Sequence, residues 1–290
     1  MKKLLSLGIA TAALTTGALA ADLPSRPVFA PPPAFSWNGC YIGVNVGAIR
    51  EDTNSFLIPS GFYTNPAGGA APVNVGGSGL LQGDIVTSRY NLDDTGWTGG
   101  AQWGCNYQAA GYLVFGVESD IQWSGVNSRE FGAFGTRPSA NPAFTVQSRT
   151  ETVTSDLNWF STFRGRAGVA LDRLYVYATG GVVWGDIGSS TAVNFTTGGG
   201  PAFVYDGAAH FGSRSETRFG GVVGGGVEYA FWNNLSLKAE YLYLSFQGEK
   251  HYSPLTAPPG INPRYTWTTT VQPNDHVVRI GLNWRFGSLW

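Results

Sequence analysis

The chain has 290 residues, of which 13% are charged and 14% aromatic, with 41 glycines and a formal net charge of -1. Few charges together with many glycines and aromatics favour a β protein over a helical one, because Glu, Lys and Ala are depleted in strands. The nearly neutral charge gives no electrostatic basis for a nucleic-acid partner, so none is expected.

The N-terminus predicts a signal peptide over residues 1–20. Lys2 and Lys3 form its positive start, Leu4 to Leu14 its apolar core, and an A-x-A site ends at Ala20, after which we expect cleavage. A membrane helix is the alternative, but the apolar core is short for one. Residues 21–36 are proline-rich, which indicates a stiff periplasmic leader, with a tail without function as the alternative.

No later stretch approaches the roughly 18 consecutive apolar residues that a membrane-spanning helix needs. A chain that crosses a bilayer without such helices must do so as a closed sheet, because unpaired backbone groups are not tolerated in hydrocarbon. If the mature protein is a membrane protein, residues 37–290 are therefore expected to form an outer-membrane β-barrel.

From Trp37 onward, segments of alternating apolar and polar residues recur, and about eight reach the ~9–11 residues that a tilted strand needs to cross a bilayer. They are Trp37–Arg50, Thr95–Tyr107, Tyr112–Ser124, Leu157–Ala170, Leu174–Ile187, Thr217–Ala230, Leu235–Gln247 and His276–Phe286. Short turns are expected at Gln108–Gly111, Leu171–Arg173 and Phe231–Asn234, and long loops at Glu51–Asp94, Gly125–Asp156, Gly188–Glu216 and Gly248–Asn274. Short periplasmic turns and long extracellular loops are typical of outer-membrane barrels.

The last candidate strand, His276–Phe286, shows a two-sided pattern most clearly. Its even-numbered residues form a nearly unbroken apolar and aromatic stripe, whereas its odd-numbered residues include Arg279, Asn283 and Arg285. In a membrane barrel the first face meets lipid and the second meets a closed interior. A secreted β-sandwich or a soluble lipid-binding barrel is the alternative, in which the charged face would meet solvent.

Aromatic residues near the strand ends favour the membrane barrel, because aromatic girdles lie at the two membrane interfaces. The residues assigned to these girdles are Trp37, Tyr107, Trp123, Trp159, Tyr175, Trp184, Tyr229 and Trp284. The predicted fold is therefore all-β, an eight-stranded antiparallel up-and-down transmembrane β-barrel.

Six segments of the mature chain also carry a family resemblance. They are WNGCYIGVNVG (Trp37–Gly47), FGVESDIQWSG (Phe115–Gly125), FRGRAGVALDRLYVYATGG (Phe163–Gly181), GGGVEYAF (Gly224–Phe231), LSLKAEYLYLSF (Leu235–Phe246) and VRIGLNWRF (Val278–Phe286). With them the chain resembles the outer-membrane immunogenic, small porin-like barrels of alpha-class proteobacteria. The resemblance implies an eight-stranded, abundant, surface-exposed barrel in the bacterial outer membrane, without catalytic residues.

Nine charged residues share the inward-facing side of the predicted strands: Glu118, Asp120, Arg164, Arg166, Glu228, Lys238, Glu240, Arg279 and Arg285. Strands that carry acids lie beside strands that carry bases, as for Glu118 beside Arg164. An eight-stranded barrel is just wide enough for side chains to fill, and buried charges there must pair. We therefore predict an ion-pair network that plugs the lumen, with a narrow or gated pore as the alternative.

The two cysteines, Cys40 and Cys105, lie at the start of the first predicted strand and near the end of the second. An antiparallel hairpin brings both to the periplasmic rim with the same outward orientation. Because the periplasm is oxidising, a structural disulfide is expected, and two free thiols are the alternative.

Gly281, Trp284 and Phe286 form a glycine followed by aromatics in the last strand, and this pattern resembles the C-terminal signal that the barrel-insertion machinery reads. In contrast, the pair His251 and Ser253 resembles the catalytic pair of barrel-type lipid A deacylases, but no carboxylate follows before Trp267 to orient the histidine. We therefore expect neither catalysis nor a cofactor or metal site.

The function predicted from the sequence is envelope structure and surface presentation. The expected partners are outer-membrane lipids, lipopolysaccharide and the insertion machinery. A small diffusion porin for hydrophilic solutes is one alternative, and an adhesin or receptor that uses its long loops, such as Glu51–Asp94, is another.

Overall fold

The computed structural model describes residues 35–63, 73–74, 87–135, 137–138, 145–146, 148–196, 203–204, 209–257 and 265–286. The predicted signal peptide (1–20) lies outside these residues, and so does the predicted leader (21–36) apart from Phe35 and Ser36. Among the described residues, no helix is long and apolar enough to cross a membrane.

The described chain is built from β-strands. They are β1 (Gly39–Tyr63), β2 (Val73–Asn74), β3 (Ser88–Ala109), β4 (Leu113–Phe134), β5 (Arg137–Pro138), β6 (Thr145–Val146), β7 (Arg149–Leu171), β8 (Leu174–Phe195), β9 (Phe203–Val204), β10 (Ala209–Ala230), β11 (Leu235–Phe246), β12 (Glu249–Ala257), β13 (Tyr265–Gln272) and β14 (Asn274–Phe286).

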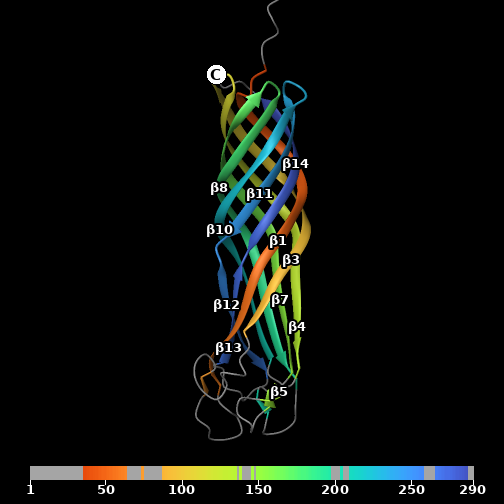
Figure 1. Ribbon diagram of the computed structural model, residues 1–290, viewed down its shortest axis with the longest axis vertical. Coiled ribbons are helices and arrows are strands. Elements are labelled where there is room, and N and C mark those ends of the chain that lie inside the picture. The colour runs from red at the N-terminus through yellow and green to blue at the C-terminus, as the bar shows by residue number, and fades with distance from the viewer. Residues whose placement is uncertain are drawn as a thin grey trace, which may run out of the picture. The chain divides into compact units, whose positions relative to one another are not determined.

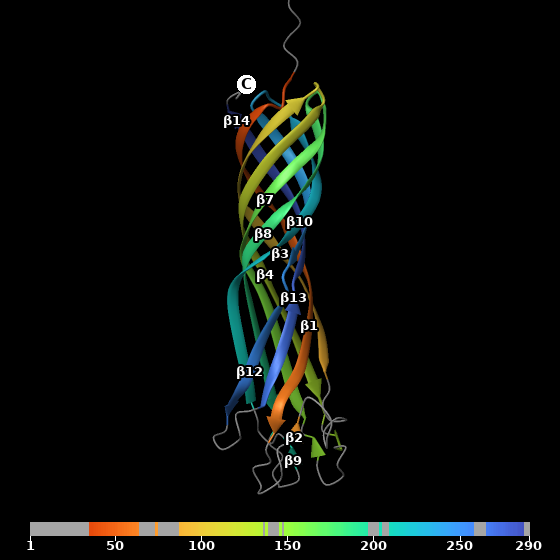
Figure 2. The same cartoon turned by 90° about the vertical axis from the view of Figure 1, so that its left-hand side faces the viewer.

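The sheet closes into a long antiparallel barrel (Figures 1 and 2). Near the short turns, the ring of described strands runs β1-β3-β4-β7-β8-β10-β11-β14 and back to β1. Farther along the axis, β12 and β13 take the places of β11 and β14 between β10 and β1. The breaks in the wall fall at Gln247–Gly248 and at Pro273. We call the end with the turns after β3, β7 and β10 the short-turn end, and the opposite end the long-loop end.

The eight predicted strands and the three predicted short turns are confirmed. At the first turn, Gly111 has a φ of 77°, a left-handed conformation that glycine adopts without strain. The turn between β7 and β8 contains Asp172 and Arg173, and the turn between β10 and β11 spans residues 231–234. Closure removes the exposed strand edges that an open sheet of this length would present.

The four long connections are shorter than predicted, and the predicted loop bounds are wrong. The wall continues through the stretches assigned to the loops Glu51–Asp94, Gly125–Asp156, Gly188–Glu216 and Gly248–Asn274, and the last of these contains the β12–β13 hairpin. The physical reason is that the lipid-facing apolar stripe ends near residue 50 of β1, while backbone pairing continues beyond it. Outside hydrocarbon, an outward face can be polar, so the apolar pattern marks the end of the membrane band rather than the end of the strand.

The two-sided pattern read from β14 is confirmed. Val278, Ile280 and Trp284 are 60%, 56% and 50% exposed on the outside, whereas Arg279 and Asn283 are buried inside. A soluble sandwich would bury the apolar face, so this arrangement matches a barrel whose outer surface meets lipid.

The assignment of the aromatic girdles is wrong at two positions. Trp37 and Tyr175 are fully buried in the lumen at the short-turn end. Tyr107, Trp123, Tyr229 and Trp284 are about half exposed on the outer surface, and Trp159 and Trp184 are half-buried. Proximity to a strand end could not distinguish the two groups, because inward side chains at a barrel mouth lie at the same height as a girdle.

Candidate functional site

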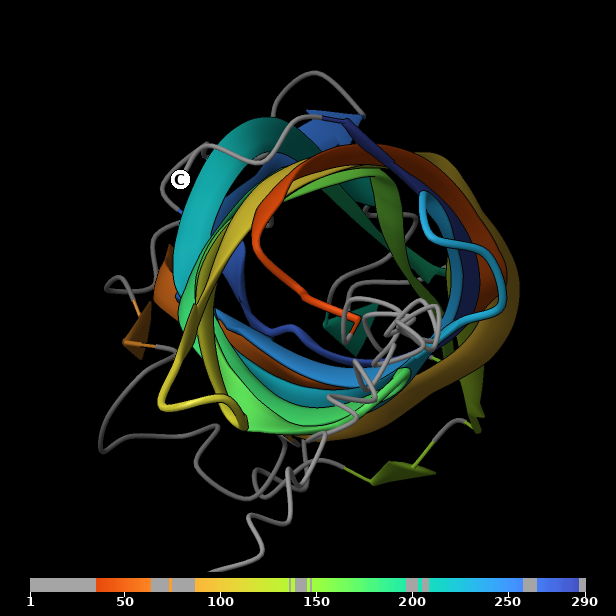
Figure 3. The same cartoon turned by 90° about the horizontal axis from the view of Figure 1, so that it is seen from above.

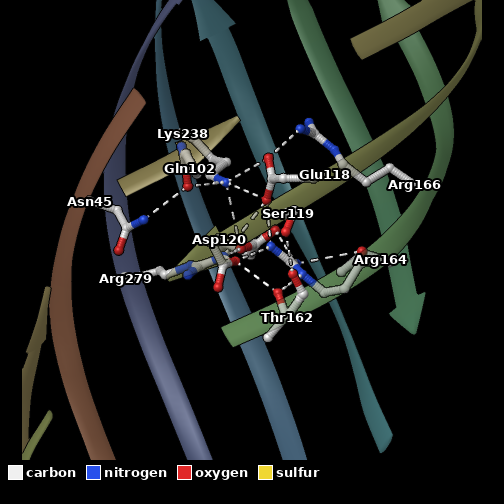
Figure 4. Close-up of polar contacts among 12 residues, drawn as sticks. Asn45, Gln102, Glu118, Ser119, Asp120, Thr162, Arg164, Arg166, Lys238 and Arg279 are labelled. Atoms are coloured by element: carbon white, nitrogen blue, oxygen red, sulfur yellow. Dashed lines mark hydrogen bonds and ion pairs between the residues drawn. The ribbon is translucent and has the colours of Figure 1, made fainter. Parts of the chain in front are cut away.

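Eight charged side chains from five strands meet inside the barrel, and six of them are labelled in Figure 4. We call them the ion-pair network: Glu118 and Asp120 on β4, Arg164 and Arg166 on β7, Glu228 on β10, Lys238 and Glu240 on β11, and Arg279 on β14. Spacing of two residues puts both members of a strand's pair on one face. The register then sets acids beside bases, with Glu118 opposite Arg164 and Glu240 opposite Arg279.

Arg164 lies at the centre of the ion-pair network. Its guanidinium is 2.9 Å from Asp120 Oδ2 and 3.0 Å from Glu240 Oε1, and it also donates to Glu118. Its side chain is fully buried. One planar cation thus joins three carboxylates from two other strands, a geometry that the fork of donors on arginine suits.

Arg279 and Lys238 complete this central group from the other side of the lumen. Arg279 Nη2 lies 2.8 Å from Asp120 Oδ2 and 2.7 Å from Glu240 Oε2. Lys238 Nζ lies 2.9 Å from Glu118 Oε1. Contacts across the lumen, between strands that are not neighbours, fill its cross-section with protein atoms.

Arg166 extends the ion-pair network toward the short-turn end. It contacts Glu118 Oε2 at 2.7 Å and Glu228 Oε2 at 2.8 Å. Its guanidinium carbon also lies 4.1 Å from the centre of the Tyr177 ring, in cation–π geometry. Tyr41 donates its hydroxyl to Glu118 at 2.5 Å and in turn accepts from Arg166.

Neutral side chains that the sequence analysis did not single out add hydrogen bonds to the ion-pair network. Gln102 accepts from Lys238 at 2.8 Å and from Asn45 at 3.0 Å, and it donates to Asn283. Tyr177 donates to Glu240 at 2.9 Å. Their inward orientation follows from the two-residue period of a strand. Their hydrogen-bond partners lie on distant strands and could not be predicted from the sequence.

Four carboxylates and four cations make the ion-pair network formally neutral. Removing two charges from water costs several kcal/mol per ion, and the attraction between them offsets this only when geometry and hydrogen bonding are good. Here Glu118, Asp120 and Glu240 each contact more than one cation. The arrangement can hold the strands in one register and block the lumen, and it leaves no charge in excess to attract a substrate.

The structure places Arg285 elsewhere, so its assignment to the lumen ion pairs is wrong. Its guanidinium donates to the carbonyl oxygens of Ser36 at 3.0 Å and Asn233 at 3.1 Å, and its carbon lies 4.4 Å from the centre of the Phe35 ring. It follows Arg279 by six residues, roughly 20 Å along a strand. The mouth at the short-turn end offers it carbonyls and aromatic rings in place of a carboxylate.

Phe35 and Trp37 belong to an aromatic cap over this mouth, formed by Trp37, Val114, Ala170, Tyr175, Tyr177 and Ala230, with Phe35 packed against it. The Trp37 indole donates to the carbonyl oxygen of Asp172 at 3.0 Å, and its ring lies 5.3 Å from that of Tyr175. Figure 3 shows the ring end-on, with the orange segment that leads into β1 crossing its opening.

An apolar layer crosses the lumen on the other side of the ion-pair network. It consists of Ile49, Val126, Leu157, Phe160, Val183, Ile187, Val222, Leu242, Leu244, Phe246 and Val277, all buried. The order along β11 shows the layering, since Lys238 and Glu240 precede Leu242 and Leu244. The sequence analysis missed this layer because a polar lumen was expected and these residues share the inward face with the charges.

We call the part of the barrel between the apolar layer and the long-loop end the long-loop half. Many of its inward side chains are Ser, Thr, His and acids. His251 contacts Ser189 Oγ at 3.2 Å and Thr191 Oγ1 at 3.0 Å. Burial lowers the pKa of His251 to about 4, so the ring is neutral at physiological pH. His251 and Ser253 both point into the barrel and are buried, so the structure does not present them to lipid as a deacylase would require.

Cys40 and Cys105 are joined by a disulfide between β1 and β3. The two residues are direct register partners, and their Cα atoms are 3.9 Å apart. The bond lies near the short-turn end and ties the first strand of the barrel to the second.

Trp284 and Phe286 lie on the outer face of β14, 50% and 46% exposed. Gly281 faces the lumen, where a Cβ atom would lie 3.1 Å from Gln102 Nε2. The two aromatic residues of the predicted insertion signal therefore lie on the outer face of β14 and its glycine on the lumen face. That the insertion machinery recognises this pattern stays a prediction.

Comparisons with known proteins place the chain in a family. Residues 9–286 match the family described as outer membrane protein beta-barrel domain. The 31 kDa outer-membrane immunogenic protein of Brucella melitensis is 32% identical over 292 residues, covering 99% of this chain and all of that protein. The 22 kDa outer membrane protein of Rhizobium leguminosarum is 27% identical over 187 residues, covering 64% of this chain and 69% of that protein.

Solved structures with similar folds are more distant. The outer membrane protease OmpT from Escherichia coli aligns with a TM-score of 0.42 at 9% identity, covering 88% of this chain and 99% of that chain. OprG from Pseudomonas aeruginosa aligns with a TM-score of 0.41 at 9% identity, covering 87% and 99%. The family match over residues 9–286, nearly the whole length, shows that this chain belongs to the outer membrane protein β-barrel domain family.

Proposed function

We propose that the protein is a closed, non-catalytic barrel that contributes to envelope integrity and presents its long-loop half at the cell surface. The observation that carries this proposal is the filled lumen, in which the aromatic cap, the ion-pair network and the apolar layer follow one another along the axis. Side chains from opposite walls meet at each level, so the described lumen is packed like a protein core.

The length of the wall supports surface presentation. Beyond Arg50, β1 continues to Tyr63 with its backbone paired to β3 and β13. At about 3.4 Å per residue, these strands carry the loops well outside the apolar band. The long-loop half is then extracellular and the short-turn end periplasmic, and the partners are the bilayer, lipopolysaccharide and the insertion machinery.

Conductance separates this proposal from a diffusion porin. Purified full-length protein reconstituted in a planar bilayer should show no stepwise conductance at either polarity, because the apolar layer and the ion-pair network fill the described lumen with side chains. A general diffusion porin prepared in the same detergent provides the positive control. Reproducible single-channel steps from this protein would contradict the proposal and favour the porin.

The insertion signal gives a second prediction. The double variant Trp284→Ala/Phe286→Ala should lower the assembled fraction in the outer membrane severalfold, because these aromatics end the outer face of the last strand. The measurement is the heat-modifiable folded band on unheated gels. The matched control is Val278→Ala/Ile280→Ala, which removes apolar area from the same face of β14. If the control variant lowers the assembled fraction equally, the loss of apolar area alone explains the effect, and the prediction of an insertion signal is wrong.

A further inference from the structure

Two buried carboxyl groups in the long-loop half lack the cationic partners that every carboxylate of the ion-pair network has. Glu51 on β1 and Asp275 on β14 are direct register partners, face the lumen, and are 3% and 2% exposed. No described residue forms an ion pair with either of them. They lie one step beyond Arg50 and His276, where the apolar band ends, so they are outside the membrane-spanning segments.

The groups that face this carboxyl pair add no positive charge. On β3, Asp94 is the register partner of Glu51 and contributes a third carboxyl. On β4, Ser128 donates its hydroxyl to Glu51 Oε2, and Asp275 Oδ1 has no hydrogen-bond partner. Burial raises the pKa of Glu51, and burial together with the neighbouring Glu51 carboxylate raises the pKa of Asp275 well above its usual range.

The carboxyl pair lies at the base of the β12–β13 hairpin. The wall is interrupted on one side of this hairpin at Gln247–Gly248 and on the other at Pro273, directly before Asn274 and Asp275. Single backbone hydrogen bonds span these breaks, from Phe246 to the Pro273 carbonyl at 3.2 Å and from Gln247 to the Phe219 carbonyl at 3.0 Å. Two short connections thus join the hairpin to the part of the barrel nearer the short-turn end, and they can act as hinges.

The two sides of the hairpin are held unequally. On the β1 side, β13 pairs continuously from Asn54–Gln272 to Gly61–Tyr265, directly beyond the carboxyl pair. On the β10 side, the described register with β12 involves only Ala209 and His210, and nearer the short-turn end β10 bows away from β12 (Figure 2).

Along this gap, Ser213 to Thr217 are exposed on both faces of β10. Side chains bridge it instead of backbone bonds, since Arg218 contacts Glu249 at 2.9 Å and Arg214 contacts the same carboxylate at 3.6 Å. The pairing of β13 with β1 is therefore the main attachment of the hairpin.

We propose that Glu51 and Asp275 form a pH-operated latch for the β12–β13 hairpin, which stays docked while the pair holds a proton and swings out through the β10–β12 gap when both carboxyls ionise. The repulsion between two carboxylates acts at the base of the attachment to β1. The gap on the other side supplies the direction of movement, because few backbone bonds must break there. This inference concerns a movement of the barrel wall and holds whether or not the lumen conducts.

The direction of the pH effect follows from linkage. A carboxyl whose pKa is higher in the docked state than in the open state binds more protons when docked. Docking is therefore favoured at acidic pH and weakens as the pH rises toward the raised pKa. Each unit of pKa difference changes the docking equilibrium about tenfold per group.

Two histidines and one further carboxyl near the hairpin also have shifted pKa values. Burial lowers the pKa of His210 and of His251 to about 4, so both stay neutral between about pH 5.5 and pH 8. Burial raises the pKa of Glu249 despite its contacts with Arg214 and Arg218, so by the same linkage its ionisation also weakens docking as the pH rises. The Glu249→Gln variant, rather than the sign of the response, therefore separates the contribution of Glu249 from that of the latch.

Hydrogen–deuterium exchange of the full-length protein in lipid nanodiscs tests the latch. After correction for intrinsic exchange rates, amides of β12 and β13 should exchange about tenfold or more faster at about pH 8 than at about pH 5.5. The double variant Glu51→Gln/Asp275→Asn should stay protected at both pH values. Each single variant should show a smaller increase in exchange rate between the two pH values, a difference that we call the pH step. The single variants keep the test available if the double variant assembles poorly.

The matched control is Asp52→Asn/Asp93→Asn, an acid pair in register on the same part of β1 and β3 but exposed on the outer face. It should keep the pH response of the unmodified protein. Protection of the hairpin that does not depend on pH, or a step that survives in Glu51→Gln/Asp275→Asn, would overturn the proposal. Loss of the step in Glu249→Gln alone would also overturn it.

Discussion

Replacing Arg164 with alanine should destabilise the barrel by about 3–5 kcal/mol, because it leaves three carboxylates without the cation that joins them. Glu118, Asp120 and Glu240 all contact this guanidinium, and all are buried. The cost comes mainly from the buried negative charge that is left uncompensated in the ion-pair network rather than from the ion pairs themselves. The measurement is the free energy of unfolding in urea after reconstitution in lipid.

Arg50→Ala is the matched control. Arg50 is also a barrel arginine paired with an aspartate, but the Arg50–Asp93 contact is 3.6 Å long and its side chains are 62% and 49% exposed. An exposed pair of this kind contributes about 0–1 kcal/mol. If both variants lose equally little stability, the lumen already contains water at the level of Arg164, and the closed-barrel proposal fails with the prediction.

Removing the disulfide should have the second large effect, about 4 kcal/mol in the chain-entropy account of a cross-link that closes a loop of this length. Cys40 and Cys105 are separated by 65 residues, and the bond joins β1 to β3 at the start of the barrel. The variant Cys40→Ser/Cys105→Ser should therefore unfold at a lower urea concentration than the oxidised protein.

Reductant provides the internal control for this measurement. Adding it to the unmodified protein should lower the unfolding midpoint toward that of the double serine variant, and it should leave the variant unchanged. An unmodified protein whose midpoint does not respond to reductant, although the thiols are shown to be free afterwards, would contradict a stabilising role of the bond.

The two predictions concern different parts of the folding problem. The disulfide restricts the unfolded chain, so its loss acts through the unfolded ensemble. The ion-pair network exists only after eight strands have closed, so the loss of Arg164 acts on the native state. Cys40, Cys105 and Arg164 were all recognisable in the sequence, but the number of contacts that Arg164 makes was not.

The sequence by itself determined the class of fold and the facing of its strands. Period-two alternation put Arg279 and Asn283 inside and Val278 and Trp284 outside, and the structure confirms it. Hydrocarbon on one side forces this separation at every residue, so the signal is local and readable. The same pattern separated the short turns from the rest and gave the strands their order around the ring.

Only the tertiary structure decided what fills the lumen. Inward residues of one strand meet residues of strands that are far away in the sequence, as Arg279 meets Asp120 across the barrel. Alternation carries no information about height along the axis, so it could not separate Arg285 at the mouth from Arg279 in the network, or Trp37 in the cap from a girdle. The shear of the closed sheet sets those heights, and closure is a property of the whole chain.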